Sequence, residues 1–122
     1  MNTREFDKYR QRDKHCPCCG SAGPDLIPNH RANRGMGGSK ERDVPSNIIV
    51  LCSRTNGLIE SDASEAARAR AYGWKLKSWQ DPTTVPYYDS VTGTWWIATD
   101  DYSRRPATAK EITQLAAGGV AI

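Results

Sequence analysis

The chain has 122 residues, which suits one domain and leaves no room for a second sizeable core. Its formal net charge is +3, but the basic excess lies wholly in the first third: residues 1–42 carry nine lysines and arginines against five acids, and residues 43–122 carry eight against nine. No apolar stretch approaches the roughly 18 residues of a membrane span, and the start lacks the apolar core of a signal peptide. We therefore expect a cytoplasmic protein. The basic first third is typical of a surface that meets phosphates; residues 1–14 alone suit a solvated tail equally well, and phosphate contact is favoured for residues 31–42.

In chain order, the first half alternates charged or glycine-rich segments with two short strands. Residues 1–14 are polar and highly charged, which predicts either a short exposed helix or a disordered arm. A tight turn, HCPCCGS, follows, and DLIPNH (25–30) predicts a short strand. The run RANRGMGGS (31–39) has three glycines in nine residues and no periodicity, so we expect a loop that can approach a ligand closely. SNIIVL (46–51) is β-branched and apolar, which predicts a buried strand.

The second half predicts one clear helix and an aromatic hairpin. The alanine-rich run after Ser61 has acids first and arginines further on, which predicts a helix from about Asp62 to Tyr72 that Gly73 ends. VPYYDSVTGTWWIA (85–98) is typical of two short strands joined by a turn at positions 89–93. We expect the tryptophans to pack in the core and hairpin, and the C-terminal residues to form one weak helix with a frayed end.

Three polar residues stand in an arrangement that is typical of a known family. A histidine ends the first expected strand, an asparagine opens the second, and another asparagine follows nine residues later: His30, Asn47 and Asn56. At these residues the sequence resembles the HNH nucleases (His-Me finger or ββα-metal fold), in which the last histidine is sometimes asparagine. Leu51-Cys52 also stands where that family places its Leu-Cys pair. The resemblance covers about residues 15–72 and is closest to small bacteriophage members.

The resemblance implies an α+β fold with a small ββα-metal, treble-clef-like nuclease core. That core would occupy residues 15–72, after a basic N-terminal arm or short helix at 1–14. Residues 73–101 would form the aromatic hairpin packed on the core, and residues 102–122 a C-terminal tail.

The activity implied by the resemblance is a metal-dependent DNA endonuclease that hydrolyses phosphodiester bonds. A neutral imidazole can deprotonate water near pH 7, so His30 is the expected general base. In the resembled family the residue before the histidine and the third motif residue bind the metal, which here means Asn29 and Asn56. Amide oxygens are hard, neutral ligands suited to Mg²⁺ or Mn²⁺. Asn47 would orient His30 by tying the loop between the strands through backbone hydrogen bonds, and one such site in each chain would nick one strand.

Contacts with DNA are expected from the basic residues in and beside the glycine-rich loop. Lysine and arginine at such positions grip phosphates without reading bases. The candidates are Arg31, Arg34, Lys40 and Arg42. Glu60 and Asp62 have two readings, as helpers of the metal or as N-terminal acids of the helix, and we favour the second.

The cysteines predict a structural zinc site that lacks one ligand. Cys16 and Cys19 form a CPxCG knuckle, and crowded cysteines suit metal binding better than disulfides in a reducing compartment. Many HNH proteins add a second CxxC that begins at the Leu-Cys cysteine, here Cys52, but Thr55 takes the fourth position. Three outcomes stay open: His15 or Cys18 completes the tetrahedron, three cysteines bind Zn²⁺ with a water, or the thiols pack without metal.

Two other functions fit parts of the same pattern. The weak ligands Asn29 and Asn56 would also suit a zinc-knuckle DNA-binding module that has lost catalysis. The aromatic hairpin would suit an accessory subunit that docks on phage DNA-packaging proteins. On each interpretation the partner is DNA or a packaging protein rather than a membrane, the compartment is the host cytoplasm if a phage encodes the chain, and the oligomeric state is open.

Overall fold

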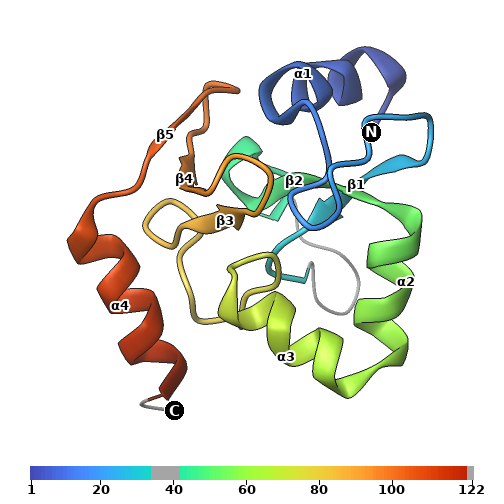
Figure 1. The fold of residues 1–122 in the computed structure, drawn as a ribbon. Helices are drawn as coiled ribbons and strands as arrows, with labels where there is room; N and C mark the ends of the chain where they lie inside the picture. The colour runs from blue at the N-terminus through green and yellow to red at the C-terminus, as the bar shows by residue number, and fades with distance from the viewer. Residues whose placement is uncertain (34–41, 121–122) are drawn as a thin grey trace.

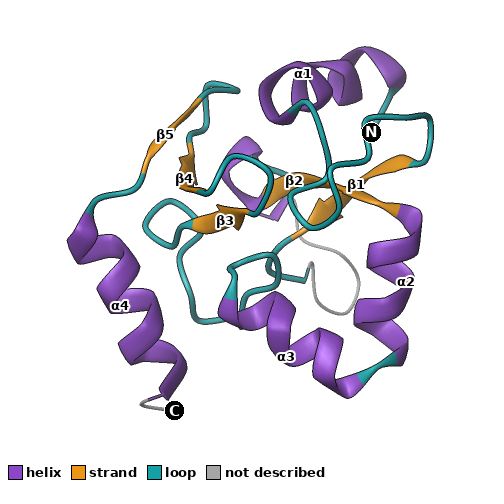
Figure 2. Ribbon diagram, viewed as in Figure 1, coloured by secondary structure: helices purple, strands orange, loops and turns teal. Residues whose placement is uncertain are grey.

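The computed structural model describes residues 1–33 and 42–120 of the chain. Within these residues the fold is α+β, with four α-helices and two small antiparallel sheets, which confirms the predicted class (Figures 1 and 2). The elements in chain order are α1 (Thr3–Asp13), β1 (Leu26–His30), the 3-10 helix η2 (Pro45–Asn47), β2 (Ile48–Cys52), α2 (Ser53–Ser61), α3 (Ala63–Ala71), β3 (Tyr87–Asp89), β4 (Thr94–Ala98), β5 (Arg104–Pro106) and α4 (Ala109–Val120).

The β1–β2 hairpin forms the centre of the molecule. The strands pair antiparallel, with Leu26 opposite Cys52 and His30 opposite Ile48, so both predicted strands are confirmed. All residues of β2 are buried, as its unbroken apolar sequence predicts. Helix α1 packs on β2, and α2, which follows β2 directly, contacts both strands (Figure 1). The hairpin is thus covered by helices that lie on both sides of it in sequence.

Helix α1 is anchored to the hairpin by a buried ion pair at its C-terminal end. Arg12 Nε donates to Asp13 Oδ1 at 2.7 Å, and Arg12 Nη1 donates to the carbonyl of Pro45 at 2.9 Å. Asp13 Oδ2 accepts from the backbone N–H of Val50 at 3.0 Å, and Asp13 Oδ1 accepts from Tyr87 Oη at 3.1 Å. Of the two alternatives for residues 1–14 the helix is confirmed, but Arg12 and Asp13 in its last turn are buried instead of exposed.

Two consecutive helices follow β2, where the sequence predicts one. The predicted helix is α3, whose first turn is capped by Asp62: its Oδ1 accepts from the backbone N–H of Ser64 at 2.8 Å and of Glu65 at 3.2 Å. The favoured reading of Asp62 as a helix cap is confirmed. The preceding helix α2 begins at Ser53 in the polar sequence SRTNG, and the Sγ of Cys52 accepts from Thr55 N at 3.3 Å. Its apolar anchor on the core is Ile59.

The second sheet holds the predicted hairpin and one further strand. Strand β3 pairs with β4, with Tyr87 opposite Trp96, and the turn between them ends at Gly93 with φ +69°. Strand β5, from the charged sequence RRP, pairs with the other edge of β4 and was not predicted. Trp74 is buried, but Trp79 is 58% exposed, so the expectation that all tryptophans pack is wrong for Trp79. No helix in the described part of the chain is long and apolar enough to cross a bilayer.

Arg31 lies in the interior, which corrects its predicted contact with DNA. The residue has no exposed surface, and each of its guanidinium nitrogens donates to backbone carbonyls. The acceptors are Gly73 at 2.8 Å, Ser46 at 3.3 Å, Pro82 at 3.2 Å, Val85 at 2.7 Å and Pro86 at 3.3 Å. These contacts can use all five N–H groups of the guanidinium, so none is left for a phosphate. Its side chain instead joins the end of β1 to the segment between α3 and β3.

Replacing Arg31 should therefore destabilise the whole domain. We expect Arg31→Met to lower the free energy of unfolding by about 3 kcal/mol, because several buried carbonyls lose their donor at once. Urea denaturation followed by tryptophan fluorescence measures this change. Arg4→Met, on an exposed position of α1, is the matched control and should change stability little. Equal stability of the two variants would contradict the structural role of Arg31.

Candidate functional site

The loop between β1 and β2 is closed at its base by Asn47. The residue is fully buried at the end of η2, directly before β2. Its Oδ1 accepts from the backbone N–H of Ala32 at 2.9 Å, and its Nδ2 donates to the carbonyls of Ala32 and Arg42, both at 3.0 Å. The predicted hydrogen bonds from Asn47 to the backbone of this loop are thus present. They fix the two ends of the loop immediately beside the last residue of β1.

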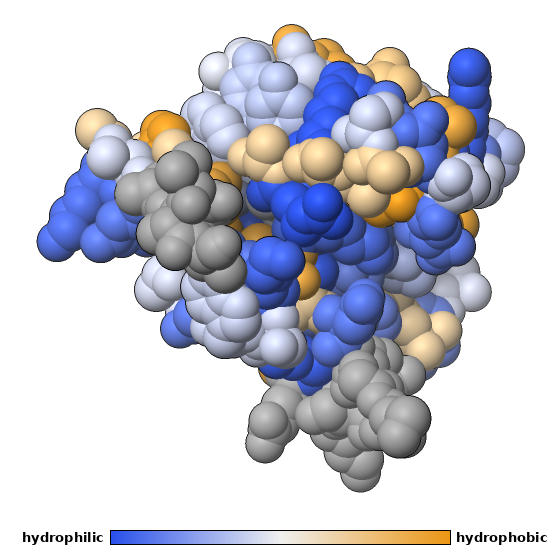
Figure 3. All heavy atoms as spheres, turned by 90° about the horizontal axis from the view of Figure 1, so that it is seen from below, coloured by the Kyte–Doolittle hydropathy of each residue, from blue (hydrophilic) through white to orange (hydrophobic). Residues whose placement is uncertain are grey.

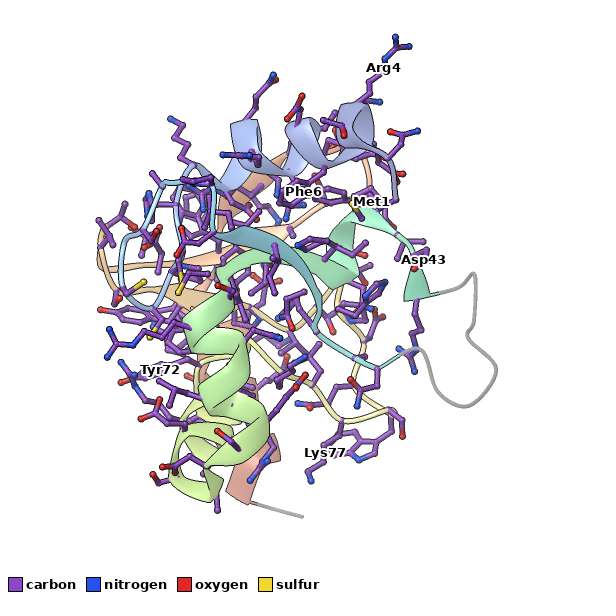
Figure 4. All side chains as sticks on the ribbon, turned by 90° about the vertical axis from the view of Figure 1, so that its right-hand side faces the viewer. Met1, Arg4, Phe6, Asp43, Tyr72 and Lys77 are labelled. Carbon is purple, nitrogen blue, oxygen red and sulfur yellow. The ribbon has the colours of Figure 1, made fainter. Side chains whose placement is uncertain are left out.

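His30 is the last residue of β1, and the carboxylate of Asp43 lies against its imidazole ring. Nε2 of His30 lies 2.6 Å from Oδ1 of Asp43, and the two side chains are 26% and 40% exposed. If Nε2–H donates to the carboxylate, Nδ1 keeps the lone pair that a base needs. Asp43, labelled in Figure 4, thus orients the imidazole of His30, and both side chains are partly open to solvent.

Asp43 is a site residue that the sequence analysis missed. It follows Arg42 in a charged stretch, and an acid there has no spacing motif that links it to His30. The only signal in the sequence is its position just ahead of Pro45, at the return of the loop to the strand pair. The antiparallel register explains the contact, because His30 pairs with Ile48 and so brings the chain before β2 close to the ring.

The two amides expected to hold the catalytic metal are placed differently from each other. Asn29 is 3% exposed, its Nδ2 donates to the carbonyl of Trp74 at 3.0 Å, and its Oδ1 is buried without a hydrogen-bond partner among the described residues. Asn56 lies inside α2 and is half-buried. Within the described part of the chain no hydrogen bond joins either amide to His30. The orphan Asn29 oxygen is the feature here that suits a cation, because a buried acceptor without a donor is costly.

Of the remaining residues predicted to contact phosphate, Arg42 lies in the described part of the chain. Arg42 is half-buried, and its Nη2 donates to the carbonyl of Ser78 at 2.7 Å, which fixes one end of its guanidinium. Arg34 and Lys40 lie outside the described residues. Glu60 is exposed near the C-terminal end of α2.

Three cysteines from distant parts of the chain meet at one point. The Sγ atoms of Cys16, Cys19 and Cys52 all lie within 4.8 Å of one another, which is compatible with one metal ion. Cys16 and Cys52 are buried, and Cys19 is exposed. A tight turn presents the first two, since the backbone N–H of Gly20 donates to the carbonyl of Cys16 at 2.9 Å. Cys52 comes from the junction of β2 and α2, so a bound metal would join the turn to the core.

Thr55 lies beside two of these three cysteines. Its Oγ1 lies 3.1 Å from the Sγ of Cys52 and 3.8 Å from the Sγ of Cys16. Burial tends to raise the pKa of Cys52, but hydrogen bonds with the hydroxyl and backbone N–H of Thr55, together with those to Cys19 and Cys16, lower it overall. Burial raises the pKa of Cys19. The threonine therefore favours the thiolate form of its nearest neighbour, as a metal site requires.

His15 and Cys18, the other proposed fourth ligands, point to other partners. His15 Nε2 lies 2.8 Å from Oδ2 of the buried Asp89. The Sγ of Cys18 accepts from Nη1 of Arg68 at 3.5 Å. Neither side chain belongs to the metal-compatible group found among the described residues. The arrangement therefore favours three thiolates with Thr55 or a water in the fourth position.

Comparisons of the chain with protein-family models, with curated proteins and with solved structures found no match. Its function therefore has to be argued from its own geometry. Two features carry chemical meaning: the paired His30 and Asp43 at the end of β1, and the three-cysteine cluster at the start of α2.

Supplying a fourth thiolate should tighten metal binding. We expect Thr55→Cys to hold Zn²⁺ at least about tenfold more tightly than the parent chain, because four thiolates complete a closed tetrahedral site. Competition with a chromophoric chelator measures the affinity. Ser53→Cys, which adds a thiol at an exposed position of the same helical turn, is the control and should leave the affinity unchanged. An equal gain in both variants, or none in Thr55→Cys, would contradict the assigned geometry.

Proposed function

We propose that the chain is a metal-dependent endonuclease that hydrolyses phosphodiester bonds in DNA, with His30 as the general base. The observation that carries the proposal is the imidazole of His30 held at 2.6 Å by Asp43, at the solvent-facing end of a strand. The order of β1, β2 and α2 adds support, because the resembled HNH family builds its site on a ββα unit.

Each residue of the pair has a defined task in this reaction. Nδ1 of His30 takes a proton from water, and the imidazole becomes positively charged. Asp43 accepts a hydrogen bond from Nε2–H, holds the ring in one tautomer and stabilises that positive charge. Asn47 holds the two ends of the β1–β2 loop together through three hydrogen bonds to the backbone. These bonds also fix the direction of the end of β1, where His30 lies.

The residues for a catalytic cation are Asn29 and Asn56, as the resemblance implies. Support comes from the buried Oδ1 of Asn29, which has no donor among the described residues. A bound Mg²⁺ or Mn²⁺ would stabilise the charge that develops on the phosphate and on the leaving oxygen. Both amides are neutral, so the chain alone should hold such an ion loosely.

The cysteine cluster would serve structure instead of catalysis. We propose that Cys16, Cys19 and Cys52 bind Zn²⁺, which suits thiolate ligands. The ion would tie the turn after α1 to the first residue of α2. The helix that carries Asn56 would thus be braced at its start.

A second candidate function is a DNA-binding module without catalysis. Its support is the pair of proposed metal ligands, Asn29 and Asn56, which are neutral amides and offer a divalent cation no carboxylate. A module of this kind would bind DNA with or without magnesium and leave it uncut.

Removing the proposed base should abolish cleavage without unfolding the chain. We expect His30→Ala to slow nicking of supercoiled plasmid in Mg²⁺ or Mn²⁺ by about 10²- to 10⁴-fold, the usual contribution of a general base. The loss of Tm should be small, since this ring is partly exposed. Cleavage by His30→Ala at the parent rate would exclude the mechanism, and an intact parent chain that binds but never cuts would favour the second function.

Asp43 should contribute through the histidine. We expect Asp43→Asn to reduce the nicking rate by about 10- to 100-fold, because the amide no longer offers a carboxylate to stabilise the charged ring. The loss should appear in kcat with little change in KM, because Asp43 contacts the imidazole and not the DNA. Asp7→Asn, on an exposed position of α1, changes the net charge equally and should leave both readouts unaltered.

A further inference from the structure

An open groove runs beside the proposed active site, between the α2–α3 pair and the segment that follows α3. Its volume is about 360 Å³. The residues that line it include Ile59, Glu60, Arg70, Lys75, Leu76 and Lys77. Figure 3 views the molecule from the side on which α3 lies in Figure 1, and hydrophilic side chains cover much of that face. Of the residues that the sequence singles out, only Glu60 lines this groove, and none of the predicted DNA-contacting residues within the described part of the chain does.

The charge of the groove is predominantly positive. Arg70, Lys75 and Lys77 contribute three cations, against the single carboxylate of Glu60. Arg70 and Lys77 are exposed, and neither forms a salt bridge within residues 1–33 and 42–120. Burial lowers the pKa of Lys75, and the nearby Glu60 opposes this effect. Two cations of the rim are thus available to an external anion.

The groove is attached to the strand that ends at His30. Lys75 Nζ donates to the carbonyl of His30 at 3.2 Å. The backbone N–H of Leu76 donates to the carbonyl of Arg31 at 2.8 Å, and Leu76 forms a parallel bridge with Ala32. The wall of the groove and the end of β1 are therefore one hydrogen-bonded unit, which fixes the position of the groove relative to the backbone of His30.

We propose that this groove binds the sugar-phosphate backbone of DNA beside the phosphate presented to His30. The rim supplies cations for phosphates, and the buried side chains of Ile59 and Leu76 form the apolar floor between them. A neutral or apolar partner would leave these cations without a counter-charge. The choice of DNA rests on the proposed nuclease function, but the groove itself is defined by charge and shape.

Binding without cleavage tests the groove. The measurement is fluorescence anisotropy of a labelled 20-base-pair duplex, in the His30→Ala background, without added divalent metal and over a range of salt concentrations. We expect Arg70→Gln and Lys77→Gln each to weaken binding about three- to tenfold and to reduce the slope of log K against log salt by about one. Arg4→Gln removes the same charge from α1, which lies at the opposite end of the molecule from Lys77 in Figure 4, and should change neither quantity.

The outcomes distinguish a failure of the proposed groove from a failure of the proposed nuclease activity. Weaker binding in both groove variants supports the groove, even if the parent chain cuts no DNA. An unchanged affinity and salt slope overturn it, even if the parent chain proves to be a nuclease. An equal loss in Arg4→Gln also overturns it, because net charge alone would then explain the effect. Inhibition of duplex binding by millimolar inorganic phosphate in the parent, but not in the double groove variant, would further assign the site to phosphate.

Discussion

The guanidinium of Arg31 is the interaction on which the rest of the structure depends. It is a cation with no exposed surface, and its partners are backbone carbonyls of Ser46 and of the segment from Gly73 to Pro86. Burial lowers its pKa to about 10, so it remains protonated at neutral pH. Removing such a charge from water is costly, and only near-complete hydrogen bonding offsets that cost. Two segments that are distant in sequence, at Ser46 and from Gly73 to Pro86, therefore pack around this one side chain.

Because side chains alternate between the two faces of a strand, the burial of Arg31 leaves the neighbouring His30 partly exposed. In a strand, neighbouring side chains point to opposite faces, and Asn29 and Arg31 are buried while His30 between them is partly exposed. Burying Arg31 thus fixes which way the imidazole faces. Gly73 allows its own backbone to pack closely against that of Pro86, because a Cβ at position 73 would lie 2.0 Å from the carbonyl oxygen of Pro86. Its φ of +74° also favours glycine.

The sequence was most informative where local pattern and burial agree. The apolar run of β2 and the capped, alanine-rich α3 were predictable because periodicity and capping are local signals. Arg31 was not, since a glycine-rich neighbourhood indicates a surface loop and nothing local reveals five distant carbonyls. Helix α2 was missed because its polar sequence is held by Cys52 and Ile59 through tertiary contacts. Asp43 reaches His30 only through the register of two strands, which sequence spacing does not encode.

The proposed site would gain its affinity from DNA and metal together. Neutral amides bind a divalent cation weakly, and the cations of Arg70 and Lys77 attract phosphate but repel a free metal ion. Bound DNA would change this balance, because phosphates in the groove would offset the charge of the rim and the phosphate presented to His30 would complete the surroundings of the ion. Since such coupling is reciprocal, the metal would strengthen the binding of DNA by the factor by which DNA strengthens the binding of metal. A chain with these ligands would then assemble its catalytic centre chiefly on its substrate.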